Sequence, residues 1–283
     1  MILSAGPLHN LGMAPLALAV LAVLAYGLAA WPGAASAQRR VGVVAPALLL
    51  GWLLHAALLV MDIGGWGWGR GEPGARLGFG PVLSLTVWLV LAVHTIESRF
   101  VPLPGVRRLL AGAGALGVLM AWAFPGAAHV GSNVWAPVHW ALGVAAYALF
   151  GAAVLHATML DTAEQQLRSR GAAVGVVAGG PLSGLPLLKL ERITFRFVEI
   201  GFVVLTLTLL LGVRTAMHWQ WSHKNVFSVL AWAVVATLLA GRLWFGWRGK
   251  RATRWLYAGS ALLLLAYAGS RFVFEVLLGR SGS

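Results

Sequence analysis

The side chains best able to do chemistry in this sequence are His and Trp residues that gather in three gaps between apolar runs. One gap, HWQWSHK at residues 218–224, holds two Trp, two His and one Lys. Imidazoles can ligate a metal ion, indoles can stack on a flat ring, and an ammonium can pair with an anion. The other two gaps, 63–79 and 125–140, contain further Trp and His residues. The three gaps together are the candidate site, provided that the chain brings them to one side.

An aromatic belt at a bilayer surface is the alternative explanation for these Trp residues. It accounts poorly for the pairs WGWG at 66–69 and WQW at 219–221, because these Trp lie beside Gly or inside a loop rather than at a helix end. The sequence has no HExxH motif, no Ser/His/Asp grouping and no phosphate-binding Gly loop. Hydrolase chemistry of the HExxH type is therefore not favoured.

Membrane-spanning helices must position these residues, because the composition excludes a water-soluble globular protein. Of the 283 residues, 59% are hydrophobic and only 10% are charged. A helix needs about 20 apolar residues to cross about 30 Å of hydrocarbon. The apolar runs predict an all-α integral membrane protein, a single membrane domain over 1–283. Its eight transmembrane helices are expected near 13–31, 41–62, 80–97, 107–124, 137–160, 195–217, 225–245 and 255–278.

The distribution of basic residues predicts which side the three gaps face. Fifteen of the 21 Lys and Arg residues fall in the four gaps that alternate with the candidate gaps. Basic loops stay on the cytoplasmic side of the bacterial plasma (inner) membrane. We therefore expect both termini and the three candidate gaps to lie outside. The net charge of +13 then reflects topology and contact with the anionic surface of the lipid bilayer rather than nucleic-acid binding.

The longest predicted inner loop spans residues 161–194. Lys189, Arg192 and Arg196 recur at helical spacing near its end, with apolar residues between them. This pattern predicts an amphipathic segment at the membrane interface before the sixth span. The chain contains no Cys, so disulfides and thiolate metal sites are excluded.

Two His residues inside predicted spans are further candidates. His139 opens the fifth span, with Gly143 and Tyr147 on the same helix face, so a flat ring could approach the backbone there. His55 lies seven residues before Asp62, about 10 Å below the outer end of the second span. An ionisable side chain at this depth is a candidate functional residue, and a neutral His hydrogen-bonded to another helix is the alternative.

Outward-facing imidazoles among indole planes suit a planar, amphipathic ligand, and haem is the common ligand of this kind. Cationic side chains can pair with its propionates. With no Cys for covalent attachment, the haem would be bound non-covalently. The residue types therefore point to haem as the cofactor.

Three segments resemble the CcsA/HemX-type cytochrome c assembly family, in particular its smaller, YpjD-like bacterial inner-membrane members. WLLHAALL at 52–59 is similar to the family's second-helix segment with an intramembrane His. WAPVHWALGVAAYALFGAAVLH at 135–156 is similar to the segment with the outer haem-ligand His. WQWSHKNVFSVLAW at 219–232 resembles the family's WxWDPKExxxxxxW sequence. The matching positions in this last segment are Trp219, Trp221, Lys224 and Trp232.

The resemblance implies a haem site on the outer face. It implies that His139 is an axial ligand of the haem iron and that His55 is a haem contact deeper in the membrane. The family's second outer His is missing from the last span, so His223 is the candidate for the second axial ligand. The indoles expected to cover the haem are Trp66, Trp68, Trp219 and Trp221. The cations expected to hold its propionates are Arg70, Arg76 and Lys224.

We therefore predict a haem-binding protein, not an enzyme, that assists c-type cytochrome assembly by handling haem at the outer membrane face. The expected partners are haem, the lipid bilayer and apocytochrome c or other cytochrome c assembly proteins. Two alternatives stay open. A permease or transporter component would use the same ionisable residues to line a substrate path. A structural membrane subunit without haem would assemble through small-residue faces such as Gly112 and Gly114.

Overall fold

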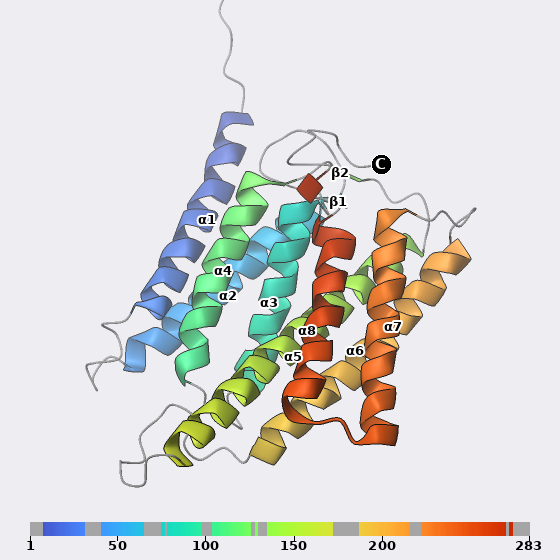
Figure 1. Ribbon diagram of the computed structural model, residues 1–283. Coiled ribbons are helices and arrows are strands. Elements are labelled where there is room, and N and C mark those ends of the chain that lie inside the picture. The colour runs from blue at the N-terminus through green and yellow to red at the C-terminus, as the bar shows by residue number, and fades with distance from the viewer. Residues whose placement is uncertain are drawn as a thin grey trace, which may run out of the picture. The chain divides into compact units, whose positions relative to one another are not determined.

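The computed structural model consists almost entirely of helices (Figure 1). It describes residues 8–31, 41–64, 75–76, 78–97, 104–125, 128–129, 135–171, 187–215, 222–269 and 272–273. The helices are α1 (Leu8–Ala30), α2 (Val41–Ile63), α3 (Phe79–Glu97), α4 (Pro104–Ala123), α5 (Ala136–Gly171), α6 (Leu187–Thr215), α7 (His223–Phe245), α8 (Gly249–Leu264) and the π-helical turn η3 (Leu265–Gly269). The predicted all-α fold with eight α-helices is confirmed for the described residues.

Six of these helices are long and apolar enough to cross a membrane. The six stretches are Ala45–Ile63, Phe79–Ile96, Val106–Ala123, Ala136–Gln165, Leu187–Arg214 and His223–Phe245. Hydrocarbon offers no hydrogen-bond partners, so a spanning segment must satisfy its own backbone groups, as a helix does. The apolar part of α1, Ala14–Ala30, is shorter, and α8 begins with a strongly basic turn. The exact number of spans and the outer position of both termini stay predictions.

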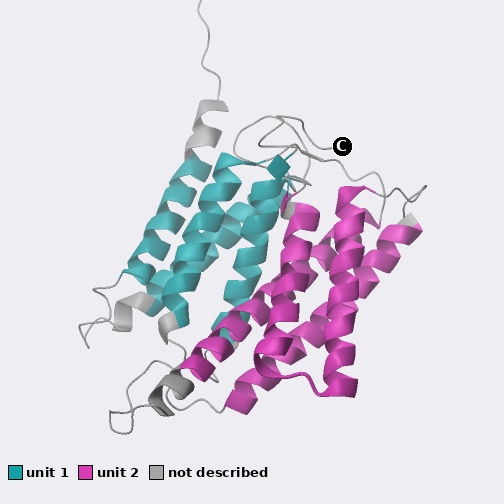
Figure 2. Ribbon diagram, in the orientation of Figure 1, with its two compact units in different colours: residues 1–133, 271–283 teal, residues 134–270 magenta. Residues whose placement is uncertain are grey.

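By its internal contacts the chain forms two compact units (Figure 2). Unit 1 comprises residues 1–133 and 271–283, in which α1 packs along α2 and α4, and α3 packs along α4. The fully buried ring of Tyr26 lies against two glycines. A Cβ on Gly51 or Gly114 would lie 2.9 or 2.7 Å from that ring, so only glycine fits at either position. A two-residue antiparallel ladder, β1 (Ala75–Arg76) with β2 (Ala128–His129), completes the described part of this unit.

A reciprocal pair of indoles joins α2 to α3 within unit 1. Trp52 donates from Nε1 to the backbone carbonyl of Trp88 at 3.3 Å, and Trp88 donates from Nε1 to the carbonyl of Trp52 at 3.0 Å. The two rings stack with centroids 4.6 Å apart and planes 9° from parallel. Both indole N–H groups therefore find partners without water.

Unit 2 comprises residues 134–270, in which α5 packs along α6 and α8, and α7 packs along α8. Its core is apolar and includes the fully buried side chains of Phe150, Phe195, Val235, Leu238 and Leu256.

The structure extends two predicted spans into the predicted inner loop. Helix α5 continues to Gly171, and α6 begins at Leu187, so the basic amphipathic segment is the start of α6 rather than a separate helix. Its apolar side chains pack inside unit 2, since Leu190 and Phe195 are buried there. The basic positions Lys189 and Arg192 stay exposed.

Candidate functional site

His139 lies in the first turn of α5, where its backbone N–H donates to the carbonyl of Trp135 at 3.0 Å. Its side chain is half-buried. The ring atom Nδ1 is buried and makes no hydrogen bond of ordinary geometry, and the backbone of Thr208 on α6 lies close to the imidazole. Buried polar atoms are nearly always paired, so a lone imidazole nitrogen at this position calls for an explanation.

A glycine on α6 makes room for this imidazole. A Cβ added to Gly212 would lie 3.1 Å from Cε1 of His139, closer than ordinary van der Waals contact. One helical turn further along α5, Gly143 faces Thr208 of α6, whose methyl group would lie 3.8 Å from an added Cβ. The face that sequence analysis assigned to a flat ligand therefore packs partly on α6. The sequence did not reveal Gly212, which sits in an otherwise uniform apolar run.

The start of α7 brings cationic and imidazole groups to the same end of unit 2. His223 and Lys224 are the first two residues of α7, and both are exposed. Ser222 caps this helix, because its Oγ accepts from the backbone N–H of Asn225 at 3.4 Å. Lys224 lies near enough to His139 for its positive charge to act on the imidazole.

The last Trp of the matched segment has a packing role. Trp232 donates from Nε1 to Oγ1 of Thr206 at 2.9 Å, which ties α7 to α6. Its ring stacks on Phe202 with centroids 5.5 Å apart. It therefore holds the two helices whose ends carry Gly212 and Lys224.

His55 and Arg76 lie in unit 1. His55 is fully buried, and both ring nitrogens have partners: Nδ1 bonds the hydroxyl of Tyr26 at 3.2 Å, and Nε2 bonds Oγ of Ser84 at 2.7 Å. Arg76 is 5% exposed, sits opposite Ala128 in the β1–β2 ladder, and its Nε has no hydrogen-bond partner.

The other predicted site residues fall in segments that the structure does not describe. Trp66, Trp68, Arg70, Trp219 and Trp221 lie outside the described residues. The structure thus brings together His139 and Lys224, with His223 beside Lys224 on α7. Within the described residues there is no cluster of three or more His, Asp or Glu able to hold a metal ion.

Comparison with known proteins gives the family. The family model described as "Cytochrome C assembly protein" matches residues 19–278. The chain belongs to the cytochrome c assembly protein family. The family resemblance expected from the sequence is confirmed, and the match also includes about half of α1.

Two relatives of this family member are informative. It is 37% identical over 144 residues to the "Inner membrane protein YpjD" of Escherichia coli, covering 50% of this chain and 52% of that protein. It is 22% identical over 224 residues to the "Cytochrome c biogenesis protein CcsA" of Prochlorococcus marinus, covering 68% of this chain and 70% of that protein. The match to YpjD thus spans only about half of that relative's length. No solved structure matches the chain.

The six long apolar helices and these relatives identify this cytochrome c assembly family member as a multi-pass protein of the bacterial inner membrane. Haem is the cofactor that the family implies, and the described residues fit it. His139 offers a buried ring nitrogen that makes no hydrogen bond of ordinary geometry, and Gly212 leaves the ring free of side-chain crowding on α6. Lys224 supplies a positive charge that suits a propionate.

Proposed function

We propose that this protein binds haem non-covalently at the end of unit 2 where α5 starts, α6 ends and α7 starts, and that it handles haem for c-type cytochrome assembly. The observation that carries the proposal is the buried Nδ1 of His139, which makes no hydrogen bond of ordinary geometry. An imidazole nitrogen without a protein partner is the group that axial ligation of haem iron requires.

The chain's own residues take distinct parts in this proposal. His139 would hold the haem iron, and its own position depends on the first turn of α5 and on the room at Gly212. His223, exposed at the start of α7, is the candidate for the second axial ligand. Lys224 holds a propionate by charge. Haem, when bound, supplies the iron centre that c-type cytochromes carry.

A carrier role explains why the α7 part of this site is exposed. His223 and Lys224 are exposed, so a ligand held by them can leave without breaking the core of unit 2. Handling requires binding, orientation and release, and no bond-making step on the protein. The outer-face location, apocytochrome c as partner and the haem contacts assigned to Trp66, Trp68, Trp219, Trp221, Arg70, Arg76 and His55 stay predictions.

The test is the absorption spectrum of the protein purified in mild detergent, oxidised and dithionite-reduced, with and without added haemin. Wild type should show a Soret band and sharp reduced bands. Both should be lost in His139→Ala, and the reduced bands should change in His223→Ala.

His156→Gln is the matched control, because His156 lies on the same helix but its Nδ1 already bonds the carbonyl of Ala152 at 2.7 Å. It should keep the wild-type spectrum. A wild type that is colourless and takes up no added haemin would overturn the proposal and leave the permease and structural-subunit alternatives.

A further inference from the structure

The turn between α7 and α8 carries a group of exposed basic and apolar side chains that the haem site does not use. The turn is residues 246–248. We call the group the α7–α8 patch; it consists of Leu243, Trp244, Phe245, Arg248, Lys250, Arg251 and Arg254.

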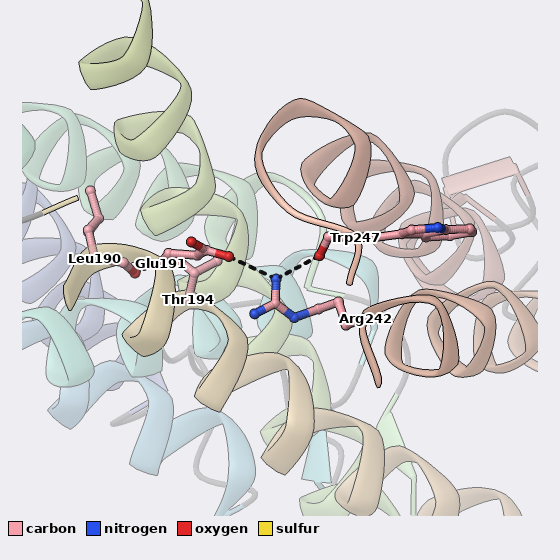
Figure 3. Close-up of polar contacts among 5 residues, drawn as sticks. All are labelled: Leu190, Glu191, Thr194, Arg242 and Trp247. Atoms are coloured by element: carbon pink, nitrogen blue, oxygen red, sulfur yellow. Dashed lines mark hydrogen bonds and ion pairs between the residues drawn. The ribbon is translucent and has the colours of Figure 1, made fainter. Parts of the chain in front are cut away.

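The turn is rigid. Gly246 ends α7 in the left-handed conformation with φ 62°, which a glycine adopts without strain. The ring of Trp247 lies so close to Gly241 that a Cβ there would be 2.4 Å from it. Arg242 then fastens the turn to α6, donating from Nη1 to Oε1 of Glu191 at 3.0 Å and to the carbonyl of Trp247 at 3.2 Å (Figure 3). In Figure 3 the indole of Trp247 points away from this contact.

Four cations project from this turn and from the start of α8, which follows it. Arg248, Lys250 and Arg254 are exposed, as is Arg251, whose guanidinium carbon lies 4.3 Å from the ring centroid of Trp247. Within the part of the chain that the structure describes, none of the four forms an ion pair. Because the backbone that carries them is held by these contacts, an anion can meet several charges, and the ordering cost is limited to their side chains.

The nearby carboxylates neutralise only part of the patch. Asp161 of α5 is engaged by hydroxyl donors, with Thr253 Oγ1 at 3.0 Å and Tyr257 OH at 2.8 Å. Glu164 lies at the first turn of α8, where an added Cβ on Gly249 would be 3.2 Å from its Oε1. Four cations against two carboxylates leave an excess of positive charge.

The apolar part of the patch is unusually open. Leu243, Trp244 and Phe245 are 82%, 79% and 74% exposed, the three highest values for large apolar side chains among the described residues. Successive helical residues point about 100° apart, so three in a row cover more than half of the helix circumference. Among the described residues, the end of α7 therefore has few protein neighbours on most sides.

The place of the patch relative to the bilayer follows from α7. The apolar stretch of α7, His223–Phe245, is 23 residues long. At about 1.5 Å per residue this is about 34 Å, close to the thickness of the hydrocarbon core. The exposed aromatic residues thus stand at one membrane surface, and the cations follow directly beyond them, at the level of lipid headgroups.

We propose that the α7–α8 patch binds the phosphate headgroup of an anionic membrane lipid, with the acyl chains lying along Leu243, Trp244 and Phe245. The cations supply the charge complement of a phosphodiester, and the apolar side chains supply the surface for its tails. This site is separate from the haem site in its residues and does not depend on haem binding.

The test is native mass spectrometry of the detergent-purified protein with added dioleoyl phosphatidylglycerol or dioleoyl phosphatidylcholine. Wild type should retain phosphatidylglycerol in preference. Arg248→Gln with Lys250→Gln should weaken phosphatidylglycerol binding about 25-fold, at about fivefold for each charge removed. The matched control is Lys189→Gln with Arg192→Gln, which removes two exposed charges from the start of α6 and should change binding less than about threefold.

Equal retention of the two lipids by wild type, or equal loss of phosphatidylglycerol in the two double variants, would overturn the proposal. Displacement of phosphatidylglycerol by millimolar inorganic phosphate would mean that the patch takes a free anion, and the lipid assignment would be wrong. If the Arg248/Lys250 variant is not monodisperse, Arg254→Gln against Arg192→Gln gives the same comparison with a difference of about fivefold expected.

Discussion

Replacing Gly212 by Ala should weaken haem binding with at most a modest loss of stability. The added Cβ would lie 3.1 Å from Cε1 of His139, which is 0.3 Å inside the 3.4 Å at which ordinary contact begins. The imidazole must then move by a few tenths of an ångström. Overpacking of this kind costs about 1–3 kcal/mol, so we expect a haemin affinity about tenfold lower. Replacing Gly by Ala in a helix is favourable by up to about 1 kcal/mol, which opposes any loss of stability.

Gly143→Ala is the control for this experiment, because it makes the same chemical change on the facing helix. There the added Cβ would lie 3.8 Å from the methyl group of Thr208, an ordinary contact. The assay is a haemin titration followed by absorbance, together with thermal unfolding of each variant. Equal haemin affinity in Gly212→Ala, Gly143→Ala and wild type would refute the reasoning that room beside His139 sets the binding strength.

Two further predictions concern stability. Tyr26→Phe and Ser84→Ala each remove one hydrogen-bond partner of the buried His55, so each should lower the free energy of unfolding by about 1–3 kcal/mol. The absorption spectrum of haemin bound at the proposed site in unit 2 should stay the same. Unchanged thermal unfolding in both variants would contradict the prediction. Arg242→Met should destabilise by about 3 kcal/mol because Glu191, 15% exposed, loses its ion-pair partner. The double variant Arg242→Met with Glu191→Met should recover part of that loss, and strictly additive effects in the double-mutant cycle would show that the pair is not coupled.

The helices were predictable because each depends on a local pattern. A run of about 20 apolar residues bounded by charge or Gly indicates a span by itself, and the predicted second span, 41–62, differs by one residue from the observed α2. The predictions were less accurate where polar helix continues past the apolar run. Helix α5 extends to Gly171 and α6 begins at Leu187, since hydropathy marks where a helix leaves hydrocarbon and not where it ends.

The candidate site was only partly predictable. The residue types of His139 and Lys224 and their neighbouring Trp residues suggested a ligand from the sequence alone. The contact between His139 and Gly212 was not predictable, because it joins residues of two helices that are far apart in the sequence. The partners of His55 were not predictable for the same reason: its hydrogen bonds to Tyr26 and Ser84 each link residues 29 positions apart. Pairings of this kind are set by helix packing, which hydropathy does not encode.

The reciprocal indole pair of Trp52 and Trp88 has a mechanical consequence. Sliding α2 past α3 by one residue is a movement of about 1.5 Å, enough to break both indole-to-carbonyl hydrogen bonds at once. Rotating either helix would also separate the stacked rings. The two helices are therefore expected to move together as one rigid pair. A rearrangement inside unit 1 is therefore expected at the contacts of this pair with α1 and α4, as a shear of whole helices.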